Sequence, residues 1–571
     1  MKIGYRELIP ASAAVVIAYF ALKYAARKIR ARKARQRGAA KLKERNSKWL
    51  ELNVDPELKE KILSMKAYQI VEAINSGSLT VQQVLNTYIM RAQELGRKYS
   101  ITAEEMFTDA INRLEDLPGG ILYGLPISIK DSFSQKGCVT SAGLVRRLGK
   151  VDTSDHPLVS QIRESGGLPF VRGNPLQIMM WFETENNIYG VAKNPWDPSR
   201  TVGGSSGGDA GIVAARCAAL AIGSDIGGSI RIPSAFCGVY GIRTTSRRTN
   251  GKEGAQTHPN KIDHFKLLIK STRGPMGRCV EDLTLVLKAW WNEQLWKKDC
   301  YLFPMKFDQE LYENTQKKKL RIGYFDYNGV FECAEVIKDI IRETKQKLEA
   351  EGHELVEFDA GNLFSEGTDI YARIAYAGDP KYLSEELEGE EPAWVYKVLD
   401  LQARFPFMKT LVPLYLRLLG HKQLARLVGL PRDISLDEFC KLFNDSAVFK
   451  NKFHDYWNSL QIDALICPIW PLVAPQHTKT KTLAAAFSYS FVWNLLDYPC
   501  GVVPVRTVRA GEDKYESTSR DKAVKSCKEI MEGSVGLPVC LQVVGYPSRD
   551  EEVLGVMKVI EGFYKFDEHP I

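Results

Sequence analysis

The chain has 571 residues, 44% of them hydrophobic and 26% charged, and a formal net charge of +8. This apolar content is enough for a large core and excludes an intrinsically disordered protein. The eleven cysteines are scattered, with no Cys-x-x-Cys pair, so we expect a reducing compartment and no disulfide framework. The eight histidines show no paired ligand spacing, so we expect no metal site and no cofactor.

An apolar segment from Leu8 to Leu22 lies near the N-terminus, and a basic run from Arg27 to Arg37 follows it. Counted through to Ala26, the apolar segment reaches about 18–20 residues, which is roughly the minimum that spans a bilayer. Strongly basic flanks stay on the cytosolic side of a membrane. We therefore expect residues 1–30 to form a single-pass anchor, with the rest of the chain in the cytosol, on the endoplasmic reticulum or another endomembrane. A cleaved signal peptide is the alternative.

The basic run also accounts for nearly all of the net charge. It holds seven lysines and arginines and no acid, which leaves +1 for the rest of the chain. A charge confined to one short segment does not make the basic face that nucleic acids require, so we expect no nucleic-acid partner.

Residues 31–75 are predicted to be a basic linker and a helical lead-in, and residues 76–571 to form one large domain. Strand-like apolar runs alternate there with helical ones, which predicts an α/β sheet with helices on both faces. The strand from Leu122 to Lys130 carries the first chemical signal. Its alternating pattern puts Ser128 and Lys130 on the polar side, with Lys130 at the strand's end. An ordinary surface lysine is the alternative.

Two serine-bearing glycine loops follow, Gly203–Gly208 and Gly223–Ser229. The segment between them, from Ala210 to Ile222, is predicted to form a helix that leads into a short buried strand. Glycine loops let backbone N–H groups approach an anion or a reacting carbonyl closely. We therefore expect the two loops to converge on one site.

Two other kinds of site fit the first loop less well. Its Gly-x-Ser-x-Gly pattern suits the nucleophile of an α/β-hydrolase, with Ser206 as nucleophile and a histidine such as His477 as base. That motif needs a strand directly before it, but residues 194–201 are typical of a turn. A phosphate-binding loop is weaker still, because no Gly-Lys-Ser/Thr follows the glycines.

Residues 404–428 form a further segment that stands apart. No acid occurs from Arg404 to Arg432, while leucines and other apolar residues recur at helical spacing. Basic amphipathic helices of this kind lie in bilayer surfaces. We expect a membrane-binding pair of helices here; a core-packed helix with a solvated basic face is the alternative.

Lys130, Ser205 and Ser229, each in its own motif and in this order, resemble the Ser-Ser-Lys triad of the amidase-signature hydrolases. The resemblance covers almost the whole chain and is strongest from Gly124 to Thr244. It implies a large, mixed, twisted β-sheet covered by helices on both faces, and the hydrolysis of amide bonds. One departure lies beside the first loop, where Asp209 replaces the usual glutamate.

In the mechanism that the resemblance implies, Ser229 attacks the amide carbon and Ser205 relays its proton to Lys130. Lys130 must start neutral, and since its ordinary pKa is about 10.4, burial has to favour the uncharged amine. The developing oxyanion would be bound by four backbone N–H groups. These belong to Ile226, Gly227, Gly228 and Ser229.

Other residues are expected to support this site. Asp225 and Arg231 would hold the second loop by hydrogen bonds, and the resemblance implies a cis peptide bond before Ser205. By the same resemblance, Met179 and Phe182 match positions that line an acyl-chain channel; ordinary core packing is the alternative. The family also has a membrane-binding cap at the basic amphipathic segment, and it suggests a homodimer.

Within the family, the chain most resembles the membrane-bound members that act on lipids. We expect it to cleave fatty acid amides, namely N-acylethanolamines and primary fatty amides, to a fatty acid and an amine through an acyl-enzyme on Ser229. One alternative is a hydrolase of other small or aryl amides or esters. A second is a catalytically inactive scaffold tethered to the membrane.

Overall fold

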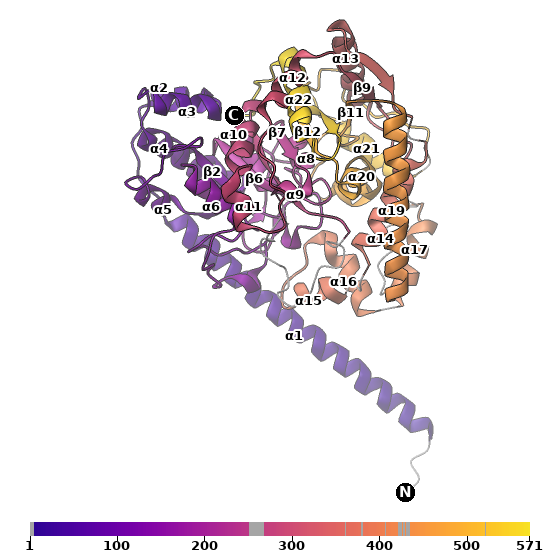
Figure 1. Cartoon of the computed structure of the whole chain (residues 1–571). Coiled ribbons are helices and arrows are strands. Elements are labelled where there is room, and N and C mark those ends of the chain that lie inside the picture. Colours follow the sequence, from indigo (N-terminus) through magenta and orange to yellow (C-terminus); the bar gives the residue numbers. More distant parts are fainter. Residues whose placement is uncertain are drawn as a thin grey trace.

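The computed structural model describes residues 5–249, 268–359, 361–377, 381–405, 407–420, 425, 429, 434–519 and 521–571. An eleven-stranded mixed β-sheet runs through this part of the chain, with helices packed along it (Figure 1). From one edge to the other, its strands are β1 (Thr102–Glu105), β3 (Leu168–Gly173), β2 (Pro126–Lys130), β6 (Leu220–Asp225), β8 (Thr272–Gly277), β7 (Tyr240–Arg243), β12 (Cys500–Thr507), β13 (Pro538–Gly545), β11 (Ala464–Pro468), β9 (Arg321–Tyr324) and β10 (Glu354–Glu357). A separate pair consists of β4 (Glu185–Asn186) and β5 (Gly190–Val191).

Helices flank this sheet, which confirms the predicted α/β class. The first half of the chain contributes α1 (Tyr5–Ser47), α2 (Pro56–Ser64), α3 (Ala67–Asn75), α4 (Val81–Arg91), α5 (Phe107–Asn112), α6 (Pro157–Glu164), α7 (Gly207–Ala214), α8 (Arg231–Cys237), α9 (Ser246–Thr249) and α10 (Val280–Trp290). The second half contributes α11 (Glu293–Lys298), α12 (Gln309–Lys317), α13 (Glu335–Ala350), α14 (Leu363–Ala375), α15 (Lys381–Glu386), α16 (Lys397–Arg404), α17 (Met408–Leu418), α19 (Leu436–Ser459), α20 (Ser488–Leu496), α21 (Ala523–Met531) and α22 (Asp550–Tyr564). Helix α7 packs against β2, β3 and β6, and α22 packs against β12 and β13.

The predicted strand that ends at Lys130 is confirmed as β2, which lies between β3 and β6 and runs parallel to both. All five of its residues are buried, as is usual for a parallel strand inside a sheet. The amine at its end is therefore removed from water, rather than placed on an ordinary polar surface.

The second glycine loop begins later than the sequence predicts. Helix α7 already ends at Ala214, and strand β6 continues through Gly223 to Asp225. The cause is tertiary, because Gly223 pairs with Gly274 of β8 and the ladder goes on to Asp225. The loop proper covers residues 226–230, between β6 and α8.

The sheet register separates two ends of the molecule. Strands β2 and β6 are parallel neighbours that finish at Lys130 and Asp225, so both residues lie at the carboxyl edge, where ligands of α/β sheets bind. Strands β7 and β8 pair antiparallel, with Tyr240 opposite Gly277. Because β8 is also antiparallel to β6, Tyr240 and Gly277 lie at the opposite edge.

Helix α1 is continuous from Tyr5 to Ser47, and its N-terminal end extends away from the body (Figure 1). Within the residues that are described, no helix combines the length and apolar character needed to cross a membrane. The single-pass anchor predicted for residues 1–30 therefore stays a prediction. The predicted boundary at residue 30 falls inside the same helix.

The predicted membrane-binding segment is described in part, since residues 406, 421–424 and 426–428 lie outside the described residues. Its helical character is confirmed in α17, which has no buried residue. Apolar side chains are exposed along α17 and just before it: Phe407 (61%), Leu411 (50%), Leu414 (53%), Tyr415 (62%) and Leu418 (79%). Whether lipid covers this face stays a prediction.

Candidate active site

Lys130 and Ser205 meet at the carboxyl edge of the sheet, as the sequence predicts. Lys130 is completely buried, and its Nζ donates to Ser205 Oγ at 2.9 Å. The same Nζ donates to Ser224 Oγ at 3.0 Å. The peptide bond between Gly204 and Ser205 is cis, which is the geometry that the resemblance implies.

Ser229 is brought to the same place by the backbone. The N–H of Ser206 donates to the carbonyl oxygen of Ser229 at 3.1 Å, which joins the two glycine loops directly. The Ser229 side chain is nearly buried, with 9% of the residue exposed. Among the described residues its Oγ has no hydrogen-bond partner.

Asp225 and Arg231 hold the second loop, as predicted. Arg231 Nε donates to Asp225 Oδ2 at 3.0 Å, and its Nη2 donates to Oδ1 at 3.1 Å. The carboxylate also accepts from the backbone N–H groups of Gly228 (2.8 Å) and Ile230 (3.1 Å) and from Asn494 Nδ2 (2.9 Å). Although burial alone raises the pKa of Asp225, the Arg231 guanidinium and these donors hold it well below its usual range. The loop is therefore built around a fixed negative charge.

The hydrogen bonds of the loop leave a cluster of free donors. Of the four predicted oxyanion donors, the N–H of Gly228 already donates to Asp225 Oδ1, which removes it from that role here. No protein acceptor is found, among the residues that the structure covers, for the N–H groups of Ile226, Gly227 and Ser229. Three N–H groups beside Ser229 are therefore available to an oxyanion.

The carbonyl groups of the loop are oriented by two side chains from distant helices. Tyr371 of α14 donates its hydroxyl hydrogen to Ile226 O at 2.8 Å, and Ser490 of α20 donates to Gly227 O at 2.8 Å. In a trans peptide the N–H points opposite to the C=O. By holding Ile226 O, Tyr371 therefore directs the Gly227 N–H away from α14.

Tyr371 and Phe491 also cover this loop. Their rings stack with centroids 3.9 Å apart. A side chain on Gly227 would come within 2.8 Å of Phe491 and 2.9 Å of the Tyr371 hydroxyl, which explains why only glycine fits there. The cover limits the access of water to the loop.

The electrostatics of the site favour a neutral amine on Lys130. Burial lowers its pKa to about 7, even though the nearby Asp209 and Asp225 carboxyl groups act to raise it. Burial likewise raises the pKa of Asp209 to about 7, against the opposing effect of Lys130. Near neutral pH, the amine is therefore poised to accept and return a proton.

Asp209 sits behind the lysine on the first turn of α7. Its Oδ1 accepts from Ser128 Oγ at 3.0 Å, and Ser128 precedes Lys130 by two residues on the same face of β2. Its Oδ2 is buried and has no hydrogen-bond partner among the described residues. The carboxyl group approaches the backbone closely, since a Cβ on Gly173 would lie 2.2 Å from Oδ1.

The two predicted channel residues lie in different surroundings. Phe182 is fully buried in an aromatic cluster, with centroids 4.6 Å from Trp470 and 4.6 Å from Phe487. Phe487 in turn stacks on Phe491, 4.3 Å away, which connects this cluster to the cover of the loop. Met179 is half-buried in a 3₁₀ turn, Gln177–Met179. An apolar wall thus extends from Phe182 toward the site.

The competing sites are not assembled. Ser206 Oγ donates to the Ser224 carbonyl at 3.3 Å, while the His477 ring contacts Pro198 O at 3.2 Å, so the two do not form a catalytic pair. One group of potential metal ligands occurs among the described residues, Cys279, Glu281 and Glu561. The ammonium of Lys558 pairs with both of its carboxylates and already supplies the positive charge.

The sequence analysis did not identify Ser224 and Tyr371, which contact Lys130 and the second loop. Ser224 could have been found from the sequence, because it directly precedes Asp225 in the second motif and lies on the strand beside β2. Tyr371 could not have been found, because it lies 145 residues from Ile226 and only the packing of α14 brings it to the loop.

Comparison with known proteins shows which family the chain resembles. Residues 83–554 match the family model described as Amidase. The chain is 32% identical to fatty-acid amide hydrolase 1 of Sus scrofa over 514 residues, which cover 89% of this chain and 87% of that protein. It is 28% identical to amidase 1 of Gibberella moniliformis, covering 88% of this chain and 93% of that one.

Solved structures agree on the fold. A structure of fatty acid amide hydrolase superposes with a TM-score of 0.76 at 22% identity, covering 94% of this chain and 95% of that chain. A bacterial aryl acylamidase of the amidase signature enzymes gives a TM-score of 0.66 at 19% identity, covering 89% and 97%. With the family model matching most of its length and the buried Lys130 in place, the chain belongs to the amidase signature family and is an amidase.

Proposed function

We propose that this amidase hydrolyses fatty acid amides through an acyl-enzyme on Ser229, with Ser205 and Lys130 as its proton relay. The observation that carries the proposal is the buried Lys130 amine, 2.9 Å from Ser205 Oγ and with its pKa lowered by burial to about 7. An amine in that state accepts a proton at neutral pH, which an exposed lysine does not.

The reaction follows from the order of the groups. Ser229 Oγ attacks the amide carbon and loses its proton to Ser205 Oγ, whose own proton passes to Lys130 Nζ. The negative oxygen that forms is bound by the free N–H groups beside Ser229. The C–N bond then breaks, and the same proton returns through Ser205 to the leaving amine. Water takes the place of the amine and attacks the acyl carbon, while its proton passes through Ser205 to Lys130. The bond between the acyl carbon and Ser229 Oγ then breaks, the proton returns to Ser229 Oγ, and the carboxylic acid is released.

A long acyl chain is supported by two apolar surfaces. The aromatic cluster around Phe182 reaches the loop through Phe487 and Phe491. The exposed apolar face of α17 suits a bilayer surface, from which a lipid amide would enter. Cytosolic placement on an endomembrane, Met179 as a channel residue and a homodimer with aligned membrane faces belong to the same proposal.

A hydrolase of smaller amides is the second candidate, because the chain is also 28% identical to acetamidases over 88% of its length. A panel of amides from acetamide to oleamide, tested on the full chain in detergent, distinguishes the two. We expect kcat/KM to rise with acyl length; a preference for acetamide would favour the second candidate.

The triad is tested by a serine-directed fluorophosphonate probe. We expect one labelled residue, Ser229, and we expect Ser229→Ala to lower turnover at least a thousandfold while the protein stays folded. Ser206→Ala serves as the matched control and should still be labelled. Labelling at Ser206 would overturn the assignment. The absence of any labelling in the folded wild-type protein would also overturn it and would favour an inactive scaffold.

A further inference from the structure

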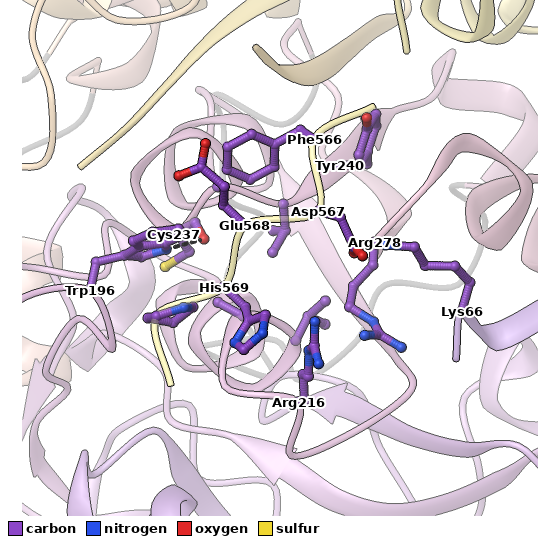
Figure 2. A pocket seen from close by; sticks show the side chains of 15 residues that line it. Lys66, Trp196, Arg216, Cys237, Tyr240, Arg278, Phe566, Asp567, Glu568 and His569 are labelled. Carbon is purple, nitrogen blue, oxygen red and sulfur yellow. Dashed lines mark hydrogen bonds and ion pairs between the residues drawn. The ribbon is translucent and has the colours of Figure 1, made fainter. Parts of the chain in front are cut away.

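A second pocket lies at the edge of the sheet opposite the active site (Figure 2). The start of β7, the residue after β8 and the end of α7 form its floor, and the C-terminal tail, residues 565–571, runs across it. Tyr240 and Arg278 place it beyond reach of Lys130, which ends β2 at the other edge.

Arg216 is the most unusual residue of this pocket. Only 9% of it is exposed, yet among the described residues its side chain makes no hydrogen bond, and its Nε is fully buried. Its φ of 56° lies in the left-handed region, which glycine would adopt more cheaply. A buried charged group without partners is costly, so an arginine at this position calls for a ligand.

Arg278 presents a second unsatisfied donor to the same space. Its Nη1 donates to Leu63 O at 2.9 Å, while its Nη2 is buried without an acceptor. The two guanidinium groups are close enough to interact, because Arg278 adds to the effect of burial in lowering the pKa of Arg216. Figure 2 shows both side chains reaching into the pocket.

The carboxylates of the tail give these arginines no hydrogen bond. Asp567 forms its ion pair with Lys66, although its charge also acts on Arg216 and Arg278, and Glu568 points away from both (Figure 2). The tail is held by that pair, by Arg91, which donates to Ile571 O at 3.2 Å, and by the buried Phe566 ring, which packs against Trp196. These contacts leave Arg216 Nε and Arg278 Nη2 without an acceptor among the described residues.

We propose that Arg216 and Arg278 form a binding site for a phosphate group, either free phosphate or a phosphate monoester. Two guanidinium forks supply donors in the planar geometry that phosphate oxygens accept, and the charge of the ligand offsets the repulsion between the two arginines. Lys66 lies at the rim, where it is already paired with Asp567.

The site is tested by equilibrium dialysis of the full chain against [32P]phosphate at constant ionic strength. We expect one equivalent to bind saturably, and roughly tenfold to hundredfold weaker binding in both Arg216→Met and Arg278→Met. Arg113→Met is the matched control, because Arg113 is an exposed arginine that pairs with Asp109 outside this pocket. Asp567→Asn should tighten binding, since it removes the carboxylate that competes for the local positive charge.

Competition with glycerol 3-phosphate separates the two sources of the group. Displacement at lower concentration than unlabelled phosphate identifies a phosphate monoester; weaker displacement identifies free phosphate. The proposal is overturned if wild-type protein binds no phosphate saturably, or if both arginine variants, shown by circular dichroism to be folded, bind as tightly as Arg113→Met. Neither result affects the amidase assignment, because amide turnover is measured separately at the other edge of the sheet.

Discussion

In the proposed mechanism, the buried Lys130 amine sets the pH range in which the enzyme works. Its neutral form accepts the proton, and with its pKa of about 7 we expect activity to fall as the pH drops below neutral. Asp209 acts in the opposite direction to burial, because its negative charge favours the protonated amine.

We therefore predict that Asp209→Asn moves the acid limb of the kcat/KM profile to lower pH, by about one unit. Removing the carboxylate lowers the pKa of Lys130, so the neutral amine persists in more acidic solution. The profile of each protein from pH 5 to 9 measures the shift. Ser128→Ala is the control, since it removes the hydrogen bond to Asp209 but no charge. An unchanged profile, or a shift to higher pH in Asp209→Asn, would contradict this role.

At the scale of elements, the oxyanion loop depends on the packing of α14 and α20. Tyr371 supplies one hydrogen bond to the loop from α14, and it is 96% buried. We predict that Tyr371→Phe lowers kcat roughly twofold to tenfold with a smaller effect on KM, because one net hydrogen bond that orients Gly227 is lost. The ring stack on Phe491 remains in this variant. A change in KM alone would mean that Tyr371 contacts substrate and does not orient the loop.

Helix α17 is the element whose exposed face the fold leaves uncovered. We predict that Leu414→Glu combined with Leu418→Glu reduces sedimentation with phospholipid vesicles at least fivefold, because two charges would have to enter the apolar layer. Val535→Glu is the matched control, with 51% exposure at a turn elsewhere in the chain. Turnover of a short, soluble amide should stay unchanged in both proteins. Equal sedimentation of the double variant and the control would refute docking through α17.

At the scale of the whole molecule, the basic stretch of α1 is not a free linker. Arg27 pairs with Asp400 at 3.0 Å, and Arg30 pairs with Glu388 at 2.8 Å. Arg45 is buried, and its Nη1 donates to the carbonyl groups of Thr102 (2.6 Å) and Ala103 (3.0 Å). The helix is thus attached to strand β1 near one end and, farther along, to α16 and the segment before it.

We predict that Arg45→Met lowers the free energy of unfolding by about 1–3 kcal/mol, since two buried carbonyl groups lose their donor. Thermal unfolding monitored by circular dichroism measures the loss. Arg35→Met, which breaks an exposed ion pair with Glu391, should change stability little. If the two variants unfold at the same temperature, α1 does not contribute to the stability of the domain through Arg45.

Much of the site could be read from local sequence. The alternation before Lys130 predicts its strand, and the two glycine loops with their serines carry the reacting groups, because these motifs are contiguous stretches of chain. The predicted end of β6 is wrong because local sequence does not show which strand pairs with it. Pairing with β8 makes Gly223 a strand residue, although its sequence is typical of a turn.

The sequence alone predicts the α/β alternation and the order of the proposed reacting groups: an amine, two hydroxyl groups and a glycine loop. The protonation and hydrogen bonding of these groups depend on the tertiary structure. Burial of Lys130 lowers its pKa, Asp225 takes the Gly228 N–H, and Tyr371 reaches the loop from far along the chain. The pKa and the hydrogen bonds of a side chain depend on the atoms around it. Those atoms belong to segments far apart in the sequence, so local sequence patterns do not predict them.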